Sequence, residues 1–250
     1  MKQKIFFGLI TILLLASCEV LDTDGLDWTN RKIITSPDDS QIPSSIKKLI
    51  HTDAATLALR DVIKDPEAKY NLVEIPADLI EIYYRGLIHI YNAKKHPPYD
   101  KISSIHVFPS PNVTGIVVMI DTTYEWTKSW KRGDRLTGNA SIDSIMEKYN
   151  LQLNSCYYDL AALYSLRSIN TYALSKKFEG IDGVRFSELN GYMGDGNDIQ
   201  AVINESHILY VFSIGWGDCP SGCMSRHYWD VAVEFNGAVK LIREYGEPLP

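Results

Sequence analysis

The sequence predicts an α+β protein, because helical and strand patterns occupy separate stretches of the chain. Apolar residues recur every three or four positions between residues 76 and 95, which indicates an amphipathic helix. Apolar and polar residues alternate between residues 229 and 236, which is typical of a strand with one buried face. The composition, 45% hydrophobic and 22% charged, suits a chain that folds around a buried core.

Residues 45–110 are predicted to form a helical segment. Asp53 is a candidate cap for a helix that ends near Ile63. Pro76 suits the first turn of the next helix, and His96-Pro97-Pro98 ends it. The apolar stripe of this helix consists of Leu79, Ile82, Tyr83, Gly86, Leu87, Ile90 and Tyr91. A strand is expected at Ile102–Phe108.

Residues 111–190 show the order strand, helix, strand, strand, helix, strand. The expected elements are a strand at Ile116–Ile120, a helix from Ser141, strands at Leu151–Tyr157 and Ala162–Arg167, a helix capped by Asn170, and a strand at Val184–Glu188. This β-α-β-β-α-β order is that of the ferredoxin-like fold. The sequence therefore predicts a ferredoxin-like core in the middle of the chain.

Residues 191–250 are predicted to form an antiparallel β unit. Ile208–Trp216 is an apolar run of strand length, and the alternating stretch at 229–236 follows it. Asn236-Gly237 is a strong hairpin signal. A two-residue turn there would place Val233 opposite Lys240, so the hairpin needs a bulge or a longer loop.

Three short stretches of the middle segment carry a family resemblance. "IDSIMEKYNLQL", "LYSLRS" and "ALSKKFEGIDGVRFSELN" resemble the propeptides and protein inhibitors of subtilisin-type proteases. The resemblance covers residues 115–190 and implies a ferredoxin-like fold and an inhibitory function. Two features depart from the family, because residues 122–140 form an insertion that carries Trp126 and Trp130, and no protease domain follows.

The start of the chain resembles a lipoprotein signal peptide. Lys2 and Lys4 precede the apolar run Ile5–Ala16, which at 12 residues is too short to span a membrane as a helix. Leu15-Ala16-Ser17-Cys18 then resembles the lipobox of bacterial lipoproteins. The resemblance implies a signal peptide at 1–17 and lipid on Cys18. Residues 18–44 carry this anchor and, because they lack strong periodicity and contain Asp, Thr, Ser and Pro, are expected to form a flexible tether. Glu19 after the lipidated cysteine points to the outer membrane.

Charge narrows the choice of partners. Cleavage before Cys18 would remove Lys2 and Lys4, and so would take the net charge from −6 to −8. An acidic surface disfavours binding to nucleic acid. We therefore expect the membrane, through the lipid on Cys18, and an envelope or extracellular protein as partners, and no nucleic acid.

The loop "GWGDCPSGCMSRHYW" at residues 215–229 is the densest group of unusual residues. Within it, "WGDCPSGC" followed by "RHYW" resembles a motif that recurs in secreted and lipid-anchored bacterial proteins without an assigned activity. Three interpretations compete. Cys219 and Cys223 form a disulfide, which the oxidising compartment favours; or they bind a metal with His227 and either His207 or Asp218; or one thiol is catalytic.

Other candidate binding groups lie near this loop. Asp218, Arg226 and His227 are candidates for binding a ligand, with Arg226 and His227 suited to an anion, although a local ion pair of Arg226 is the plainer interpretation. Asp195, Asn197 and Asp198 in "GDGND" resemble half of a calcium-binding repeat, but a single copy is more typical of a turn. No cofactor-binding motif was found.

The sequence as a whole predicts a non-catalytic binding protein of the cell envelope. This expectation depends on the absence of any assembled catalytic motif, such as Gly-x-Ser-x-Gly or His-Glu-x-x-His. The alternatives are a protease inhibitor, from the family resemblance, and a metal-dependent enzyme that uses Cys219, Cys223 and His227. We expect no enzymatic activity and no cofactor.

Overall fold

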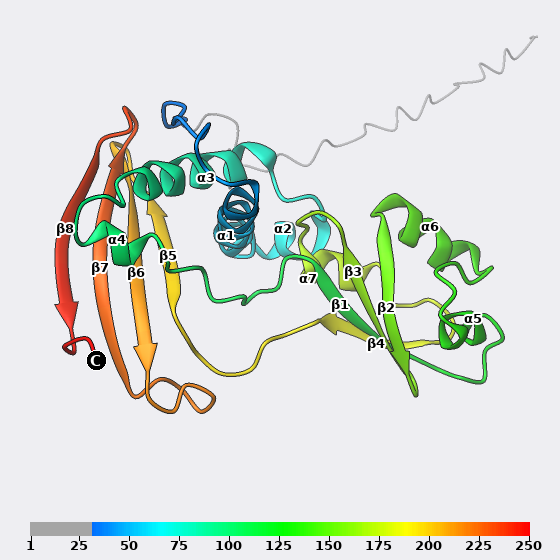
Figure 1. Cartoon of the computed structure of the whole chain (residues 1–250). Helices are drawn as coiled ribbons and strands as arrows, with labels where there is room; N and C mark the ends of the chain where they lie inside the picture. The colour runs from blue at the N-terminus through cyan, green and yellow to red at the C-terminus, as the bar shows by residue number, and fades with distance from the viewer. Residues whose placement is uncertain (1–31) are drawn as a thin grey trace, which may run out of the picture.

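The computed structural model describes residues 32–250, and it has the predicted α+β class (Figure 1). The helices are α1 (Ser44–Val62), α2 (Pro66–Asn71), α3 (Ala77–Asn92), α4 (Tyr99–Ile102), α5 (Thr127–Arg132), α6 (Ala140–Lys148) and α7 (Thr171–Lys176). The strands are β1 (Gly115–Ile120), β2 (Leu151–Tyr157), β3 (Leu160–Ser165), β4 (Val184–Leu189), β5 (Asp198–Ile203), β6 (His207–Trp216), β7 (Ser225–Glu234) and β8 (Val239–Gly246). The predicted signal peptide and Cys18 lie outside the described residues.

Strands β1 to β4 form an antiparallel sheet in the order β2-β3-β1-β4. Two β-α-β crossovers with that order are the split arrangement of the ferredoxin-like fold, as the sequence predicts. Helices α5, α6 and α7 cover one face of the sheet and bury a separate core. Its buried side chains include Trp130, Phe178, Met146, Leu174, Ile116, Val118 and Ile120. Residues 122–140, the predicted insertion, contribute α5 and Trp130 to this core.

The second sheet has the order β5-β6-β7-β8 and packs against α1 and α3. Figure 1 shows these helices on one side of the sheet. Leu59 of α1, Ile82 of α3 and Trp229 of β7 belong to one hydrophobic core. The helical segment and the C-terminal β unit, separate in sequence, therefore fold together into one structural unit.

Helix α3 approaches the second sheet closely at Gly86. A Cβ atom at this position would lie 2.8 Å from the ring carbon Cζ of Tyr210 in β6. Tyr210 is fully buried, and its hydroxyl donates a hydrogen bond of 3.1 Å to the carbonyl of Tyr83. Only glycine lets the helix backbone approach this closely.

The chain joins the fold earlier than the sequence predicts. Ile34 and Ile42 are buried in the core of the second sheet, and the amide of Thr35 donates to the carbonyl of Phe235. The prediction of a flexible tether up to residue 44 is therefore wrong for its last part. Two apolar isoleucines, ten and two residues before α1, give this stretch a place on the core.

Three other local predictions are wrong. Asp53 is not a cap, because α1 begins at Ser44 and runs through it. Residues 103–108 do not form a strand, and α4 occupies the start of the expected range. The second strand of the hairpin β2–β3 is Leu160–Ser165 instead of Ala162–Arg167. Asp53 lies inside α1, and its carboxylate binds His106 and the amide of Val107, as described below.

The hairpin at Asn236-Gly237 is confirmed with a longer loop. Val233 lies opposite Val239, and the amide of Glu234 donates to the carbonyl of Ala238, so the three residues 235–237 form the turn. Gly237 has a φ of 90°. A three-residue loop with glycine in the left-handed region is a common hairpin connection. Among residues 32–250, no helix has both the length and the hydropathy that a membrane span requires.

The two structural units meet where α2 contacts α7. Asn170 is fully buried there, and its side-chain oxygen accepts from the amides of Tyr172 and Ala173 at the start of α7. Its side-chain amide donates to the carbonyls of Ala68, Lys69 and Leu72 around the end of α2. One side chain therefore caps two helices that belong to different structural units.

Candidate functional site

The loop between β6 and β7 is closed by a pair of cysteines. Pairing of the two strands continues to Trp216 opposite Ser225, so residues 217–224 form the loop. Cys219 and Cys223 lie at disulfide-bonding distance, with their Cα atoms 3.9 Å apart, as the first interpretation of the sequence predicts. Cys156, the remaining cysteine of the described chain, lies apart in β2, where burial raises the pKa of its thiol.

Arg226 is held by three protein groups next to this loop. Its guanidinium contacts the Asp195 carboxylate at 2.5 Å, the carbonyl of Gly196 at 2.7 Å and the hydroxyl of Ser213 at 2.8 Å. The hydrogen bond from Arg226 is the main cause that lowers the pKa of Asp195. The local ion pair, and not an anion site, is therefore the role that the contacts give to Arg226.

The "GDGND" segment forms a turn whose polar side chains point to different partners. Asp195 binds Arg226, Asn197 accepts from the amide of Gly215 at 3.2 Å, and Asp198 binds Arg60 of α1. A calcium ion needs oxygen ligands that converge on one point. The plain interpretation as a turn fits these contacts.

The proposed metal ligands are not brought together. His227 is buried, with Nδ1 2.7 Å from the carbonyl of Glu247 and Nε2 2.9 Å from the Glu244 carboxylate. His207 lies opposite Glu234, at the other end of the same pair of strands. Asp218 is exposed in the loop. Within residues 32–250, no three His, Cys, Asp or Glu side chains gather as a metal site.

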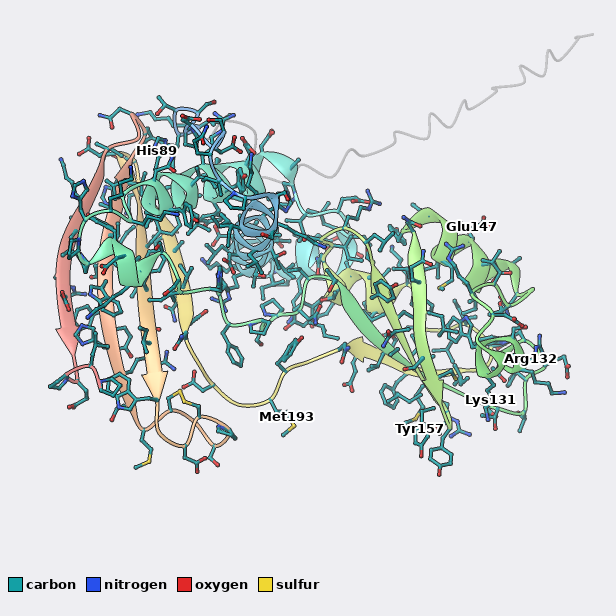
Figure 2. The ribbon with its side chains drawn as sticks, viewed as in Figure 1. His89, Lys131, Arg132, Glu147, Tyr157 and Met193 are labelled. Atoms are coloured by element: carbon teal, nitrogen blue, oxygen red, sulfur yellow. A yellow bond between two sulfur atoms is a disulfide. The ribbon has the colours of Figure 1, made fainter. Side chains whose placement is uncertain are left out.

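An exposed stretch of chain is joined at one end to this loop, and it was not among the candidate sites predicted from the sequence. Residues 190–194 connect β4 to the "GDGND" turn and are all exposed, with Tyr192 at 59% and Met193 at 99%. Figure 2 shows Met193 on this bare connection between the two sheets. One end is held by the Asn190 amide on the Gly115 carbonyl, and the other by the Asp195 amide on the Cys219 carbonyl.

The face of the first sheet that is turned away from its helices carries a row of apolar side chains. Tyr157 lies opposite Leu160, Leu160 opposite Met119, and Met119 opposite Phe186, so the row crosses all four strands. Tyr157 is 72% exposed and Phe186 is 41% exposed. Figure 2 shows Tyr157 projecting at the tip of the β2–β3 hairpin. We call these four residues the open-face row.

A signal for the open-face row was present in the sequence. Strand β3 reads Leu-Ala-Ala-Leu-Tyr-Ser, so apolar residues occupy both alternating sets of positions. A strand with one solvated face normally shows polar residues at every second position. The sequence alone does not say which of the two apolar sets is covered by helices.

Asp53 and His106 form a second arrangement that sequence reasoning missed. The Asp53 carboxylate is 2.7 Å from His106 Nδ1 and accepts from the amide of Val107 at 2.9 Å. Desolvation raises the pKa of Asp53, and the hydrogen bond to Asp53 raises the pKa of His106. The adjoining cavity of about 20 Å³ has room for roughly one water molecule, which excludes a substrate. We therefore interpret this pair as a structural contact between α1 and residues 103–108.

Comparisons with known proteins add no relative to these observations. No family model, no curated protein and no solved structure matches the chain.

Proposed function

We propose that this protein is a lipid-anchored protein of the bacterial cell envelope that binds another protein without catalysing a reaction. The open-face row, formed by Tyr157, Leu160, Met119 and Phe186, is the single observation that carries the proposal. Contiguous apolar side chains on a protein surface are typical of interaction sites. Aromatic residues and methionine are also enriched at protein interfaces.

The chemistry around the row favours a protein as the ligand. Glu188 lies opposite Val117 on the same face, two residues along the strands from the pair Met119–Phe186. An apolar row with an acidic neighbour fits a partner surface that offers apolar side chains beside a basic group. The net charge of the chain, −6, acts against an anionic ligand such as nucleic acid.

Site-specific photo-cross-linking tests this proposal. A photoreactive residue is placed at Tyr157, Leu160 or Phe186 in the full chain, expressed in a bacterial envelope. The matched control is Leu49, an exposed apolar residue of α1 on the other structural unit. We expect one shared cross-linked protein from at least two positions of the row and none from Leu49. Equal cross-linking from Leu49, or no product from the row, contradicts the proposal.

The anchor has its own test. Cys18 would carry the lipid, and Glu19 supports sorting to the outer membrane. Wild-type chain is expected to incorporate labelled fatty acid and to fractionate with the outer membrane. The Cys18→Ala variant is expected to lose both properties while it keeps its fold. Labelling that survives in this variant would rule out lipidation at Cys18.

A second candidate function is inhibition of a subtilisin-type protease. It is supported by the stretch at residues 190–194, which directly follows the last strand of the ferredoxin-like unit and is exposed and fixed at both ends. A segment held in one conformation loses less entropy when it enters a protease cleft. The candidate predicts inhibition that is weakened by Tyr192→Gly with Met193→Gly. A null result across several subtilisin-type proteases removes it.

A further inference from the structure

The paired cysteines directly hold the exposed stretch at residues 190–194. The carbonyl of Cys219 accepts from the amide of Asp195 at 2.9 Å, and the amide of Cys223 donates to the Asp195 carboxylate at 3.2 Å. Gly194 is tightly packed on the loop, because a Cβ atom there would lie 3.1 Å from the carbonyl oxygen of Cys219. Asp195 is therefore held by both halves of the cysteine pair.

The bond between the cysteines adds a covalent link to the contacts that close the loop. Gly215 is packed against Cys223 so closely that a Cβ atom would lie 2.9 Å from the Cys223 Cβ atom. Pro220, Ser221 and Gly222 between the cysteines are exposed, and within the loop the turn is held by hydrogen bonds of 3.0 and 3.2 Å. With the bond open, these turn hydrogen bonds and the packing of Gly215 remain to position the two backbone groups that hold Asp195, and Asp195 keeps its ion pair with Arg226.

We propose that the Cys219–Cys223 disulfide is a thiol-exchange site that locks the connection between the two structural units. Its co-substrate is a dithiol, either a protein or a small molecule. One thiolate of the dithiol attacks a sulfur of the pair, so that a mixed disulfide forms and the other cysteine leaves as a thiolate. The second thiol then resolves the mixed disulfide. The protein gains two electrons and two protons, and the dithiol becomes a disulfide.

Exposure and loop size make the pair suited to this exchange. Both cysteines are partly exposed, and an accessible disulfide is more readily attacked than a buried one. The closed loop has only five residues, so the bond constrains the unfolded chain less than a long-range disulfide would. Opening it therefore changes the local hold on Asp195 while the two hydrophobic cores stay intact. This site goes beyond the proposed binding function and does not depend on it.

Limited proteolysis measures how strongly the disulfide restrains residues 190–194. The full chain with Cys156→Ala is reduced with dithiothreitol, alkylated with iodoacetamide and freed of reductant, because chymotrypsin itself contains disulfides. Chymotrypsin then cleaves native protein, and mass spectrometry compares cutting after Tyr192 with cutting after Tyr158. Tyr158 is an exposed residue of the β2–β3 turn, in the other structural unit from the cysteines, and it serves as the internal reference.

We expect the ratio of cleavage at Tyr192 to cleavage at Tyr158 to rise about tenfold on reduction, as local opening becomes easier. Cys219→Ala with Cys223→Ala should show the raised ratio without any reductant, so the result does not depend on alkylation. A ratio that changes less than about twofold in the reduced chain or in the double variant overturns the proposal. An equal rise at both tyrosines shows general loosening and overturns it as well.

Discussion

Arg60 and Asp198, which are 138 positions apart in the sequence, form a bidentate ion pair with nitrogen–oxygen distances of 3.1 and 3.2 Å. The same guanidinium donates to the carbonyls of Phe108, Ser110 and Ile199. One side chain of α1 therefore holds the start of β5 and the segment that enters the ferredoxin-like unit. All five guanidinium donors point toward fixed acceptors, which only arginine can satisfy.

Loss of Arg60 is expected to destabilise the fold. Arg60→Ala removes the guanidinium from the Asp198 carboxylate, which keeps the Phe108 amide as a donor, and from three carbonyls. The site is only about one-fifth exposed, so the free energy of unfolding should fall by about 3 kcal/mol. Urea unfolding followed by tryptophan fluorescence measures the change. Arg167→Ala is the matched control, because the pair of Arg167 with Glu74 is half exposed and should matter by less than about 1 kcal/mol. Equal effects of the two substitutions would contradict this account.

Asn170 is expected to contribute more to the free energy of unfolding than an ordinary helix cap does. Asn170→Ala removes the cap of α7 and the side-chain donor to three carbonyls at the end of α2, of which that of Ala68 keeps the Leu72 amide, so a loss of about 2–3 kcal/mol is expected. Asn170→Asp keeps the capping oxygen but turns a carboxylate toward three carbonyls, and should be at least as harmful. Thermal unfolding compares both with Asn139→Ala, which removes the cap of α6 alone and should cost about 1 kcal/mol. A fully stable Asn170→Asp would show that the bonds to α2 contribute nothing.

Gly86→Ala should damage the packing of α3 on the second sheet. The added methyl group meets the Tyr210 ring, and overpacking of this kind costs about 1–3 kcal/mol. Tyr210→Phe alone loses the bond to Tyr83, which is worth about 1 kcal/mol. In the double variant the nearest clashing atom is gone, so the combined loss should be smaller than the sum of the two single losses. Strict additivity, measured by denaturant midpoints, would place the clash elsewhere.

Stability should decline above pH 6.5 through His106. The bond to Asp53 raises the pKa of His106 above its ordinary value of 6.5, so its contribution is present below 6.5 and is lost as pH rises through the folded value. Burial raises the pKa of Asp53 from its ordinary value of 3.8, so the titration of Asp53 changes the stability in the acidic range and is separate from the change above pH 6.5. In His106→Gln, the denaturant midpoint should depend less on pH between about pH 6 and 8.5 than it does in the wild type. His96→Gln, an exposed control, should keep the wild-type slope; an unchanged slope in His106→Gln would refute the assignment.

Patterns that depend on near neighbours were predicted well. Pro76 precedes α3, Asn170 caps α7, and β2 has the predicted bounds, because capping and periodicity are decided within a few residues. The order of elements also identified the split arrangement of the first sheet. Asp53 was misassigned for the opposite reason: its partners, His106 and Val107, lie more than fifty positions away.

The candidate site shows the same division. Spacing predicted that Cys219 and Cys223 can pair, since five residues with Pro220 and Gly222 close a tight loop. Nothing in the spacing reveals that this loop holds Asp195, or that Arg226 binds the same carboxylate across 31 positions. The open-face row was likewise hidden, because periodicity cannot tell which of two apolar strand faces the helices cover.

The sequence by itself determined the α+β class, the order of the elements in the ferredoxin-like unit, the Asn170 cap and the closeness of Cys219 and Cys223, since each of these is set by short-range sterics and by the period of apolar residues. Only the tertiary structure decided that residues 45–110 and 191–250 share one core. It alone decided that Arg60, Asn170 and Asp195 tie distant segments together, and that Tyr157 and Phe186 stay uncovered. Those outcomes depend on which surfaces meet when the chain collapses. The hydrophobic effect is non-directional, so the local sequence does not specify which apolar surfaces pack together.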